Sequence, residues 1–459
     1  MDYTSIAPDQ QREMLETIGV DSIDALFECI PPDARVTQPL DLPPSLSELE
    51  LQREIGRLSS KNRSTAQLAC FAGGGAYDHF IPAFIDQLIS RGEFLTAYTP
   101  YQGEASQGSL QAFFEFQTQV ARLTGMDIAN ASLYEGASSA GEGVLLALNA
   151  TGKHVVLIAG SLHPDYTTVL RTILSDLPVE LRELPVGDDG VLHPDTVRAH
   201  AGDDVACLVQ QSPNARGLVE DWSGCFAALK QASTTGKPPL AIAVCNPIAC
   251  ALLKNPGACG ADVAVGEGQP LGIPLQLGGP YLGLFAAKKD FLRKMPGRLV
   301  GMTTDAQGRR SFCLSLQTRE QHIRGAKATS NVCTNQGLLA LRATMYMSAM
   351  GRTGLREVAE QSWHKAHDLC RRIEAIDGFS RADAGHFFHE FVVTCPVPAK
   401  RVVDHCKSRG ILAGIPMDSA RLGGNGGAGD PNELLVAVTE KRSAAELDAF
   451  VHALSEMKG

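Results

Sequence analysis

The chain has 459 residues, of which 44% are hydrophobic and 20% charged, a composition typical of globular proteins. This length exceeds one compact core, so we expect two domains and an N-terminal extension. The net charge of −10 argues against a nucleic acid or an anionic membrane surface as the main partner.

The 12 cysteines are scattered, without Cys-x-x-Cys or zinc-ligand spacing, so we expect reduced thiols and no metal site. No signal peptide is apparent, and no apolar run approaches the ~20 residues that span a bilayer. We therefore expect a cytoplasmic protein.

Residues 1–65 are predicted to form a helical and extended arm. Helical patterns at Gln10–Ile18 and Ser45–Lys61 flank a proline-rich crossing, and a further helix is predicted to start at residues 21–23. The arm is too apolar for a free tail, so we expect it to wrap over a surface of its own chain or of a partner.

Residues 66–333 are predicted to form a large α/β domain, because short apolar runs alternate with amphipathic stretches. This alternation is typical of a mostly parallel sheet covered on both faces. The predicted strands are Ile128–Leu133, His154–Ala159, Val179–Leu184, Val205–Gln210, Leu240–Cys245, Val263–Val265 and Gly283–Ala287. The predicted helices include Gly108–Leu123, Ser138–Ala150, Thr167–Leu177 and Cys225–Thr235.

Residues 334–459 are predicted to form an interdomain helix and a small C-terminal α+β domain. The helical pattern falls into two parts and leads into short strands and a closing helix. The expected elements are Thr334–Met350, Leu355–Ile376, Phe387–Thr394, Lys400–Ser408, Ile411–Ile415, Glu433–Val438 and Ala444–Met457.

A lysine is missing where one class of cofactor enzyme would carry it. Residues 262–280 read as a buried strand that enters a Gly/Pro-rich loop, and an apolar strand follows. Aminotransferase-like pyridoxal-phosphate enzymes carry their Schiff-base lysine at such a strand end, whereas this chain has Gln269, whose amide cannot form an imine. Such enzymes also place an aspartate beside the pyridinium nitrogen, where this chain has Asn246. Gln269 and Asn246 therefore both indicate that this chain has lost its own pyridoxal-phosphate chemistry.

Two further stretches are candidates for the remains of the same cofactor site. Gly136, Ser138 and Ser139 lie at a strand-to-helix junction, where free N–H groups could bind a phosphate. A tightly packed junction is the alternative interpretation. His163 follows a predicted strand and could stack on a flat ring, or it could simply be satisfied by hydrogen bonds in a loop.

Residues 95–108 form a polar segment with two tyrosines and two glutamines around a proline. A plain connector needs no such cluster, so Tyr98, Thr99, Tyr101 and Gln102 are candidate site residues. A structural loop with capped helices is the alternative interpretation.

Residues 316–331 combine arginines, a lysine and a histidine. Arg319, His322 and Arg324 could bind a carboxylate or a phosphate, and an exposed charged loop is an equal alternative.

Three segments, Tyr98–Gln102, Gly266–Gly272 and Gln317–Ile323, resemble the glycine dehydrogenase (decarboxylating) P-protein family of the glycine cleavage system. Over essentially the whole chain the resemblance is to subunit 1, the alpha subunit, of the two-polypeptide form. It implies the aminotransferase-like fold (fold type I), α/β with a large and a small domain. It also implies that pyridoxal phosphate and its lysine belong to subunit 2, the beta subunit, with no cofactor covalently bound to this chain.

The resemblance implies a shared activity of the two subunits. Together they would decarboxylate glycine and pass the aminomethyl group to the lipoyl arm of H-protein, with T-protein and L-protein acting in the same system. Tyr98, Thr99, Tyr101 and Gln102 would then approach the partner's active site or its substrate channel. Two alternatives stay open: an independent pyridoxal-phosphate enzyme that uses Lys254, and a non-catalytic scaffold or regulatory subunit.

Overall fold

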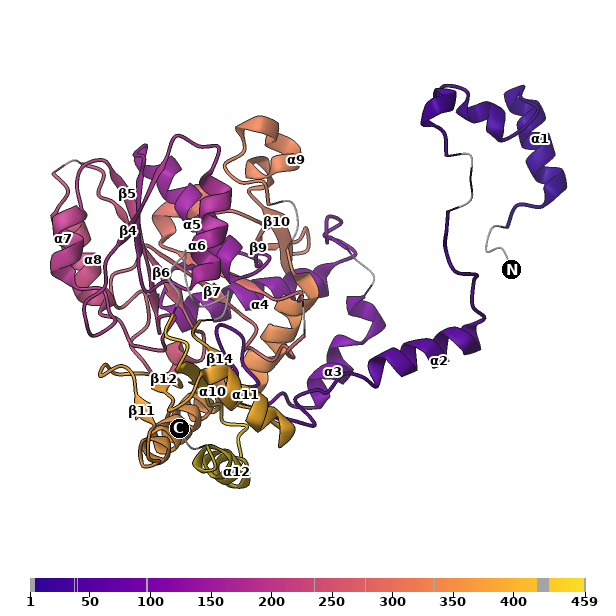
Figure 1. Ribbon diagram of the computed structural model, residues 1–459. Coiled ribbons are helices and arrows are strands. Elements are labelled where there is room, and N and C mark those ends of the chain that lie inside the picture. Colours follow the sequence, from indigo (N-terminus) through magenta and orange to yellow (C-terminus); the bar gives the residue numbers. More distant parts are fainter. Residues whose placement is uncertain are drawn as a thin grey trace. The chain divides into compact units, whose positions relative to one another are not determined.

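The computed structural model describes residues 5–36, 38, 40–95, 98–234, 236–276, 278–332, 335–418 and 429–457. The chain divides into two compact units, residues 1–63 and residues 64–459 (Figure 1). The predicted end of the arm at residue 65 lies close to this division. The predicted domain boundary at 333/334 falls outside the described residues, so the division into a large and a small domain stays a prediction.

The first unit contains two α-helices, α1 (Pro8–Ile18) and α2 (Glu48–Ser59), and two short 3-10 turns at Asp24–Phe27 and Pro32–Ala34. A proline opens α1, and Ser47 caps α2, because its side chain accepts the N–H of Glu50. None of the described residues 5–63 is buried. The two predicted helical patterns are confirmed, whereas the predicted third helix is only a 3-10 turn.

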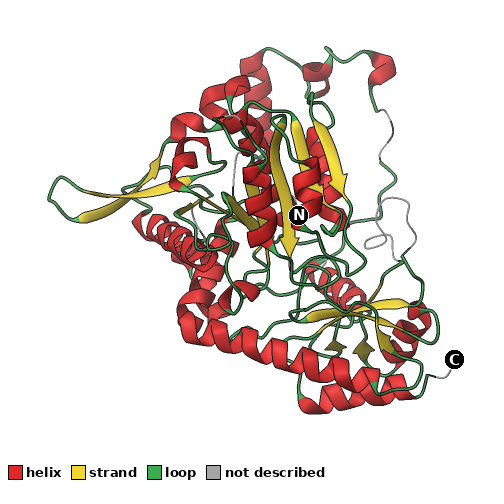
Figure 2. Cartoon of the chain, turned by 90° about the vertical axis from the view of Figure 1, so that its left-hand side faces the viewer, coloured by secondary structure: helices red, strands yellow, loops and turns green. Residues whose placement is uncertain are grey.

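A seven-stranded sheet organises the second unit (Figures 1 and 2). From one edge to the other its strands are β2 (Ile128–Ala129), β8 (Gly283–Ala287), β7 (Val263–Glu267), β6 (Leu240–Cys245), β5 (Val205–Ser212), β3 (Val155–Ala159) and β4 (Glu180–Leu184). Six of these strands run in one direction, and β8 runs in the opposite direction between β2 and β7. The sheet is therefore mostly parallel, as predicted.

Helices bury both faces of this sheet. In β6, Ile242 and Val244 pack with residues of α5 and α6, while Ala241, Ala243 and Cys245 pack with residues of α7 and α8. The continuous apolar sequence of the central strands follows from this burial on two sides. The bounds of these helices are α5 (Gly136–Thr151), α6 (Pro164–Leu174), α7 (Pro194–His200) and α8 (Trp222–Gln231).

Other elements extend this framework. Helix α4 (Gln107–Thr124) packs with the hairpin of β9 (Leu299–Thr304) and β10 (Arg310–Ser315), where the Gln107 side chain forms two hydrogen bonds with the Phe312 backbone. The sequence did not predict this hairpin, nor did it predict α7 or α3 (Phe84–Ile89).

The C-terminal part contains a long helix and a four-stranded antiparallel sheet. The helix α10 (Gly337–Glu374) has one non-helical residue, Gly351. The sheet order is β11 (Ser380–Arg381), β12 (Glu390–Thr394), β15 (Glu433–Ala437) and β14 (Ile415–Pro416), and α11 (Ala399–Ser408) and α12 (Ala444–Ser455) pack beside it.

The strand predicted at residues 411–415 is wrong as a single element. It forms β13 (Ile411–Leu412), which pairs with β1 (Ala69–Cys70), and then β14, which joins the other sheet. Gly414 lies between the two strands with a φ of 148°, a conformation that favours glycine and turns the chain.

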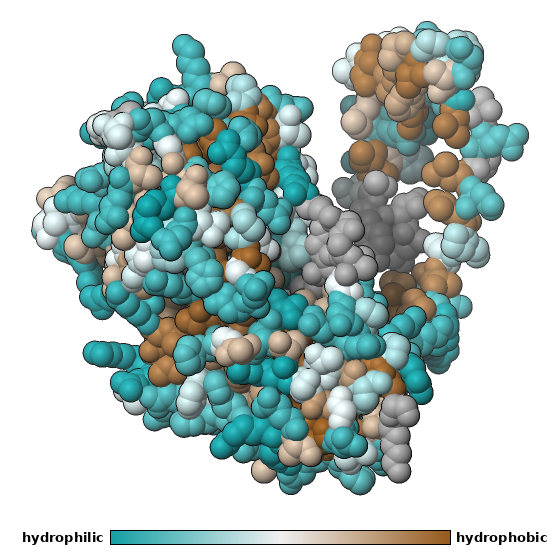
Figure 3. Space-filling view, turned by 60° about the vertical axis from the view of Figure 1, so that its left-hand side comes forward, coloured by the Kyte–Doolittle hydropathy of each residue, from teal (hydrophilic) through white to brown (hydrophobic). Residues whose placement is uncertain are grey.

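Polar side chains cover most of the visible face of residues 64–459 (Figure 3). No helix in the described part of the chain is long and apolar enough to cross a membrane.

Candidate functional site

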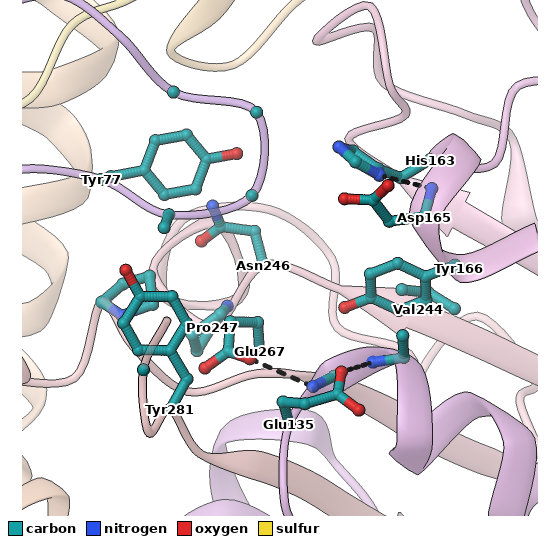
Figure 4. A pocket seen from close by; sticks show the side chains of 18 of the residues that line it. Tyr77, Glu135, His163, Asp165, Tyr166, Val244, Asn246, Pro247, Glu267 and Tyr281 are labelled. Atoms are coloured by element: carbon teal, nitrogen blue, oxygen red, sulfur yellow. Dashed lines mark hydrogen bonds between the residues drawn. The ribbon is translucent and has the colours of Figure 1, made fainter. Parts of the chain in front are cut away.

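A cavity of about 640 Å³ lies at the carboxyl edge of the seven-stranded sheet. Open α/β sheets place ligands at this edge because the loops that follow parallel strands meet there. The loops after β3, β5, β6 and β7 contribute to its wall, together with the start of α5 and the glycine-rich loop at residues 73–77 (Figure 4). Three predicted positions border this one cavity: Gly136, His163 and Asn246.

Carboxylate oxygens accept the backbone N–H groups at the start of α5, where the sequence predicted a phosphate-binding position. Glu135 caps this helix, and its side chain accepts the N–H of Ala137 at 2.6 Å and the N–H of Ser138 at 2.7 Å. The Ser138 hydroxyl donates to the same carboxylate, and the Ser139 hydroxyl donates to the Glu135 carbonyl. The donors that a phosphate would need are therefore already used within the chain.

Glu267 adds a second carboxylate at the same helix end. One of its oxygens accepts the N–H of Gly136 at 3.1 Å, and the other accepts the N–H groups of Gln269 and Leu282 (Figure 4). Burial raises the pKa of Glu267 to about 7. The Tyr166 hydroxyl also lies against Gly136, in the space that a Cβ would need there.

Gln269 is only 1% exposed, and both its amide nitrogen and its amide oxygen have backbone partners. Its oxygen accepts the N–H of Tyr77 at 2.8 Å, and its nitrogen donates to the carbonyls of Tyr77 at 3.0 Å and Ile273 at 2.8 Å. This side chain fastens the glycine-rich loop to the loop that follows β7. It is not among the residues that border the cavity.

Asn246 and His163 border the cavity and also hold turns. The Asn246 carbonyl oxygen accepts the N–H of Ile248 at 2.9 Å and the N–H of Ala249 at 3.2 Å. His163 caps α6, where its Nδ1 accepts the N–H of Asp165 at 3.1 Å (Figure 4). Both side chains therefore have a local structural role.

The opposite wall belongs to residues distant in sequence. The Tyr77 hydroxyl donates to Glu390 at 2.6 Å, and Gly74 N–H donates to the other oxygen of the same carboxylate at 2.7 Å. Burial raises the pKa of Glu390 to about 7. Beside them, His389 is 2% exposed, and its ring stands edge-on to Tyr77 at 4.5 Å.

These residues do not fit pyridoxal phosphate. Four carboxyl side chains and neither a lysine nor an arginine stand among the described residues that border the cavity. A phosphate would therefore meet carboxylates at the helix end without a compensating cation. Lys254, the alternative lysine, borders a separate and smaller cavity and donates to Ser223 at 3.1 Å.

The structure brings together the two polar segments that lie apart in the sequence. The ring of Tyr101 meets that of His322 at 5.9 Å, and the guanidinium of Arg298 lies 5.6 Å from the Tyr101 ring centre. Arg298 Nε lies 3.9 Å from a Glu320 oxygen, and both side chains are only 4% exposed.

Unsatisfied polar atoms mark this second cluster. Arg298 Nε, the Glu320 Oε1 atom and the Thr99 hydroxyl are buried and have no hydrogen-bond partner among the described residues. Tyr98 is 88% exposed, and Gln102 is also exposed. Buried polar atoms are normally hydrogen-bonded, so these three atoms are exceptions within the described chain.

Two of the three predicted anion-binding residues have backbone partners. Arg319 donates to the carbonyls of Met295 and Gly297, and Arg324 donates to the carbonyl of Lys327. His322 lies 3.7 Å from the Glu320 carboxylate. An anion site here stays a prediction, and Arg298 is the cation that the sequence analysis did not single out.

Comparison with known proteins places the chain in a family. Residues 1–454 match the family model of the glycine cleavage system P-protein. A protein of Prosthecochloris aestuarii named probable glycine dehydrogenase (decarboxylating) subunit 1 is 46% identical over 454 residues, which cover 99% of both chains. A protein of the same name from Thermomicrobium roseum is 45% identical over 457 residues and also covers 99% of both.

Solved structures give the same result. The crystal structure of an inhibitor-bound glycine decarboxylase (P-protein) of the glycine cleavage system is 42% identical, has a TM-score of 0.88, and covers 99% of this chain and 100% of that chain. A C-DES mutant with glycine covalently linked to its PLP cofactor has a TM-score of 0.61 at 14% identity, covers 86% of this chain and 98% of that chain, and shows the fold alone. The predicted fold type I is confirmed. The chain belongs to the glycine cleavage system P-protein family.

Proposed function

We propose that this chain is the subunit of glycine decarboxylase that carries no cofactor lysine. With a second subunit it would release carbon dioxide from glycine and transfer the aminomethyl group to the lipoyl arm of H-protein, in a cytoplasmic system that also includes T-protein and L-protein. The observation that carries this proposal is the closed helix end, where Glu135 and Glu267 occupy the donors of α5.

The second subunit would supply pyridoxal phosphate, which stabilises the carbanion that decarboxylation leaves. The names of the relatives support a second subunit, since they are called subunit 1. The internal use of Gln269 supports the same division, because both amide N–H groups and the amide oxygen are bonded to backbone groups of this chain.

The segment Tyr98–Gln102 would complete the active site of the partner. The exposed Tyr98 can reach a neighbouring chain, and the buried guanidinium of Arg298 supports the ring of Tyr101 from behind. The unsatisfied atoms of Arg298, Glu320 and Thr99 would find partners in the assembled enzyme. Neutral hydroxyl and amide groups can bind the carboxylate of glycine or line the path of the lipoyl arm.

Reconstitution tests this function. The purified chain, the second subunit and their mixture are each given carboxyl-labelled glycine, pyridoxal phosphate and lipoylated H-protein. We expect release of labelled carbon dioxide only from the mixture. Activity of this chain alone would contradict the proposal.

A double variant tests the role of the polar segment. Tyr98→Phe with Tyr101→Phe removes two hydroxyls and should lower the rate at least about tenfold, because each lost hydrogen bond to a transition state costs of the order of 1 kcal/mol or more. Asp176→Asn, at an exposed position, is the control and should keep full activity. Full activity of the double variant in an intact complex would place this segment outside the site.

A further inference from the structure

We propose that the cavity at the carboxyl edge of the sheet binds a small organic ammonium ion. This inference does not depend on the proposed decarboxylase role. It rests on the charge of the wall, on a buried imidazole without a partner, on the aromatic surface and on the size of the cavity.

The wall of the cavity is acidic. Its carboxyl groups are Glu135, Asp165, Glu267 and Glu390, and no lysine or arginine is found among the described residues that border it. Glu135 and Glu267 meet at the start of α5, and Glu390 lies on the opposite side beside Tyr77. Above pH 7, where Glu267 and Glu390 are mostly ionised, a cation inside the cavity would be attracted from two sides, whereas an anion would be repelled.

His389 supplies an unused hydrogen-bonding group. It is 2% exposed and borders the cavity, yet neither of its ring nitrogens has a hydrogen-bond partner in the described chain. Burial and the neighbouring His79 hold the pKa of His389 well below its usual value, so the ring is neutral and one nitrogen can accept. A buried acceptor of this kind suits the N–H of an ammonium group.

Four tyrosines form part of the remaining wall. Tyr77, Tyr134, Tyr166 and Tyr281 all border the cavity, and Figure 4 shows three of them around its space. The faces of such rings attract organic cations through their quadrupole. Tyrosines combined with carboxylates therefore favour an ammonium ion over a neutral molecule of the same shape.

The cavity is too large and too poorly clustered for a metal ion. Its volume of about 640 Å³ lies within the ~300–1,000 Å³ of small-molecule sites. No group of three His, Cys, Asp or Glu side chains in the described residues is placed to hold a metal. The occupant is thus an organic cation with an apolar body. Glycine itself should be excluded, because its carboxylate would face the acidic wall.

Three probes of similar size and different charge test this proposal by titration calorimetry of the full chain at pH 8 and constant ionic strength, where Glu267 and Glu390 are mostly ionised. We expect n-butylammonium to bind at least about tenfold more tightly than 1-butanol, and butyrate to give no saturable binding, because tenfold corresponds to one modest charge interaction. Equal binding of 1-butanol, binding of butyrate, or no saturable heat with butylammonium would overturn the proposal.

Two variants locate the site. Glu390→Gln and, at the partly exposed position, Tyr281→Ala should each weaken butylammonium binding at least about fivefold while circular dichroism stays unchanged. Asp176→Asn, at an exposed position that is not among the residues bordering the cavity, should bind as the unmodified chain does. Unchanged affinity in every cavity variant that folds would place the bound ammonium elsewhere and overturn the assignment. If only Tyr281→Ala folds, its affinity alone decides the question.

Discussion

Gln269 stands where a cofactor lysine would be expected, and it ties two loops together with all of its amide hydrogen bonds. Its oxygen accepts the N–H of Tyr77, and its nitrogen donates to the carbonyls of Tyr77 and Ile273. The residue is thus a structural fastener of the sheet edge. Restoring the lysine alone should not restore a cofactor site.

Gln269→Lys tests this role. The lysine would leave the N–H of Tyr77 unsatisfied and place a cation in a buried position, so we expect the free energy of unfolding to fall by about 3 kcal/mol. Urea denaturation measures the loss, and titration with pyridoxal phosphate should give no new visible absorbance band. Gln87→Lys, at an exposed position of α3, is the control and should change neither result.

The buried carboxyl of Glu390 predicts a pH dependence of stability. Its folded-state pKa of about 7 lies above the usual glutamate value of 4.5, so the folded chain holds this proton more tightly than the unfolded chain. The free energy of unfolding contributed by this group therefore falls as pH rises from about 4.5 to about 7 and is then constant, with a total change of at most about 3 kcal/mol.

Urea denaturation of the chain and of Glu390→Gln at pH 5.5 and pH 8 measures this contribution. The unmodified chain should lose stability relative to the variant as the pH rises. Glu115→Gln, an exposed position of α4, should show no such difference. A constant gap between the chain and Glu390→Gln at both pH values would show that this carboxyl does not titrate as described.

At the scale of elements, the sequence predicted the strands whose apolar pattern follows from burial on both faces of the sheet. Strands β6 and β8 were predicted with their observed bounds, because both are apolar at every position and buried on both faces. The hairpin of β9 and β10 was missed, because exposed polar residues such as Thr303 and Arg310 interrupt any apolar pattern.

Only those site residues that lie next to a predicted strand or helix could be predicted from the sequence. Gly136, His163 and Asn246 follow strands or open a helix, so sequence alone placed them at the sheet edge, and they do border one cavity. The contact between Tyr77 and Glu390 spans 313 positions of the sequence. No local pattern contains such a contact, which only the packing of the C-terminal sheet against the glycine-rich loop creates.

The break inside α10 gives a prediction for one element. Gly351 has a φ of 59° and a ψ of −173°, a region that is open essentially to glycine alone. Gly351→Ala should therefore lower the free energy of unfolding by about 1–3 kcal/mol, although a Cβ would have open space. Gly354→Ala, which meets only the flexible Met350 side chain, is the control in thermal denaturation. Equal stability of the two variants would contradict this account of the break.

At the scale of the whole molecule, the N-terminal unit has no buried residue among those described. Apolar side chains are instead exposed along α2, among them Leu51 at 50%, Ile55 at 55% and Leu58 at 44%. These three are spaced by four and three positions and so share one helix face. We infer that this face packs against the second subunit in the assembled enzyme.

Leu51→Ser with Leu58→Ser tests this interface in the full chain. We expect the melting temperature to stay within about 2 °C, because the substituted side chains are exposed, and the affinity for the second subunit to fall at least about tenfold. Analytical ultracentrifugation of the mixed subunits measures the affinity. Gln52→Ser, an exposed polar position of α2, is the control. Undiminished affinity of the double variant would exclude this face from the contact.

The central claim is that this chain completes a cofactor enzyme without holding the cofactor. Borohydride reduction of the assembled enzyme in the presence of pyridoxal phosphate, followed by peptide mapping of both chains, tests it most directly. We predict one stoichiometric pyridoxyl-lysine on the second subunit and none on this chain. A stoichiometric pyridoxyl group on any lysine of this chain, Lys254 included, would contradict the claim.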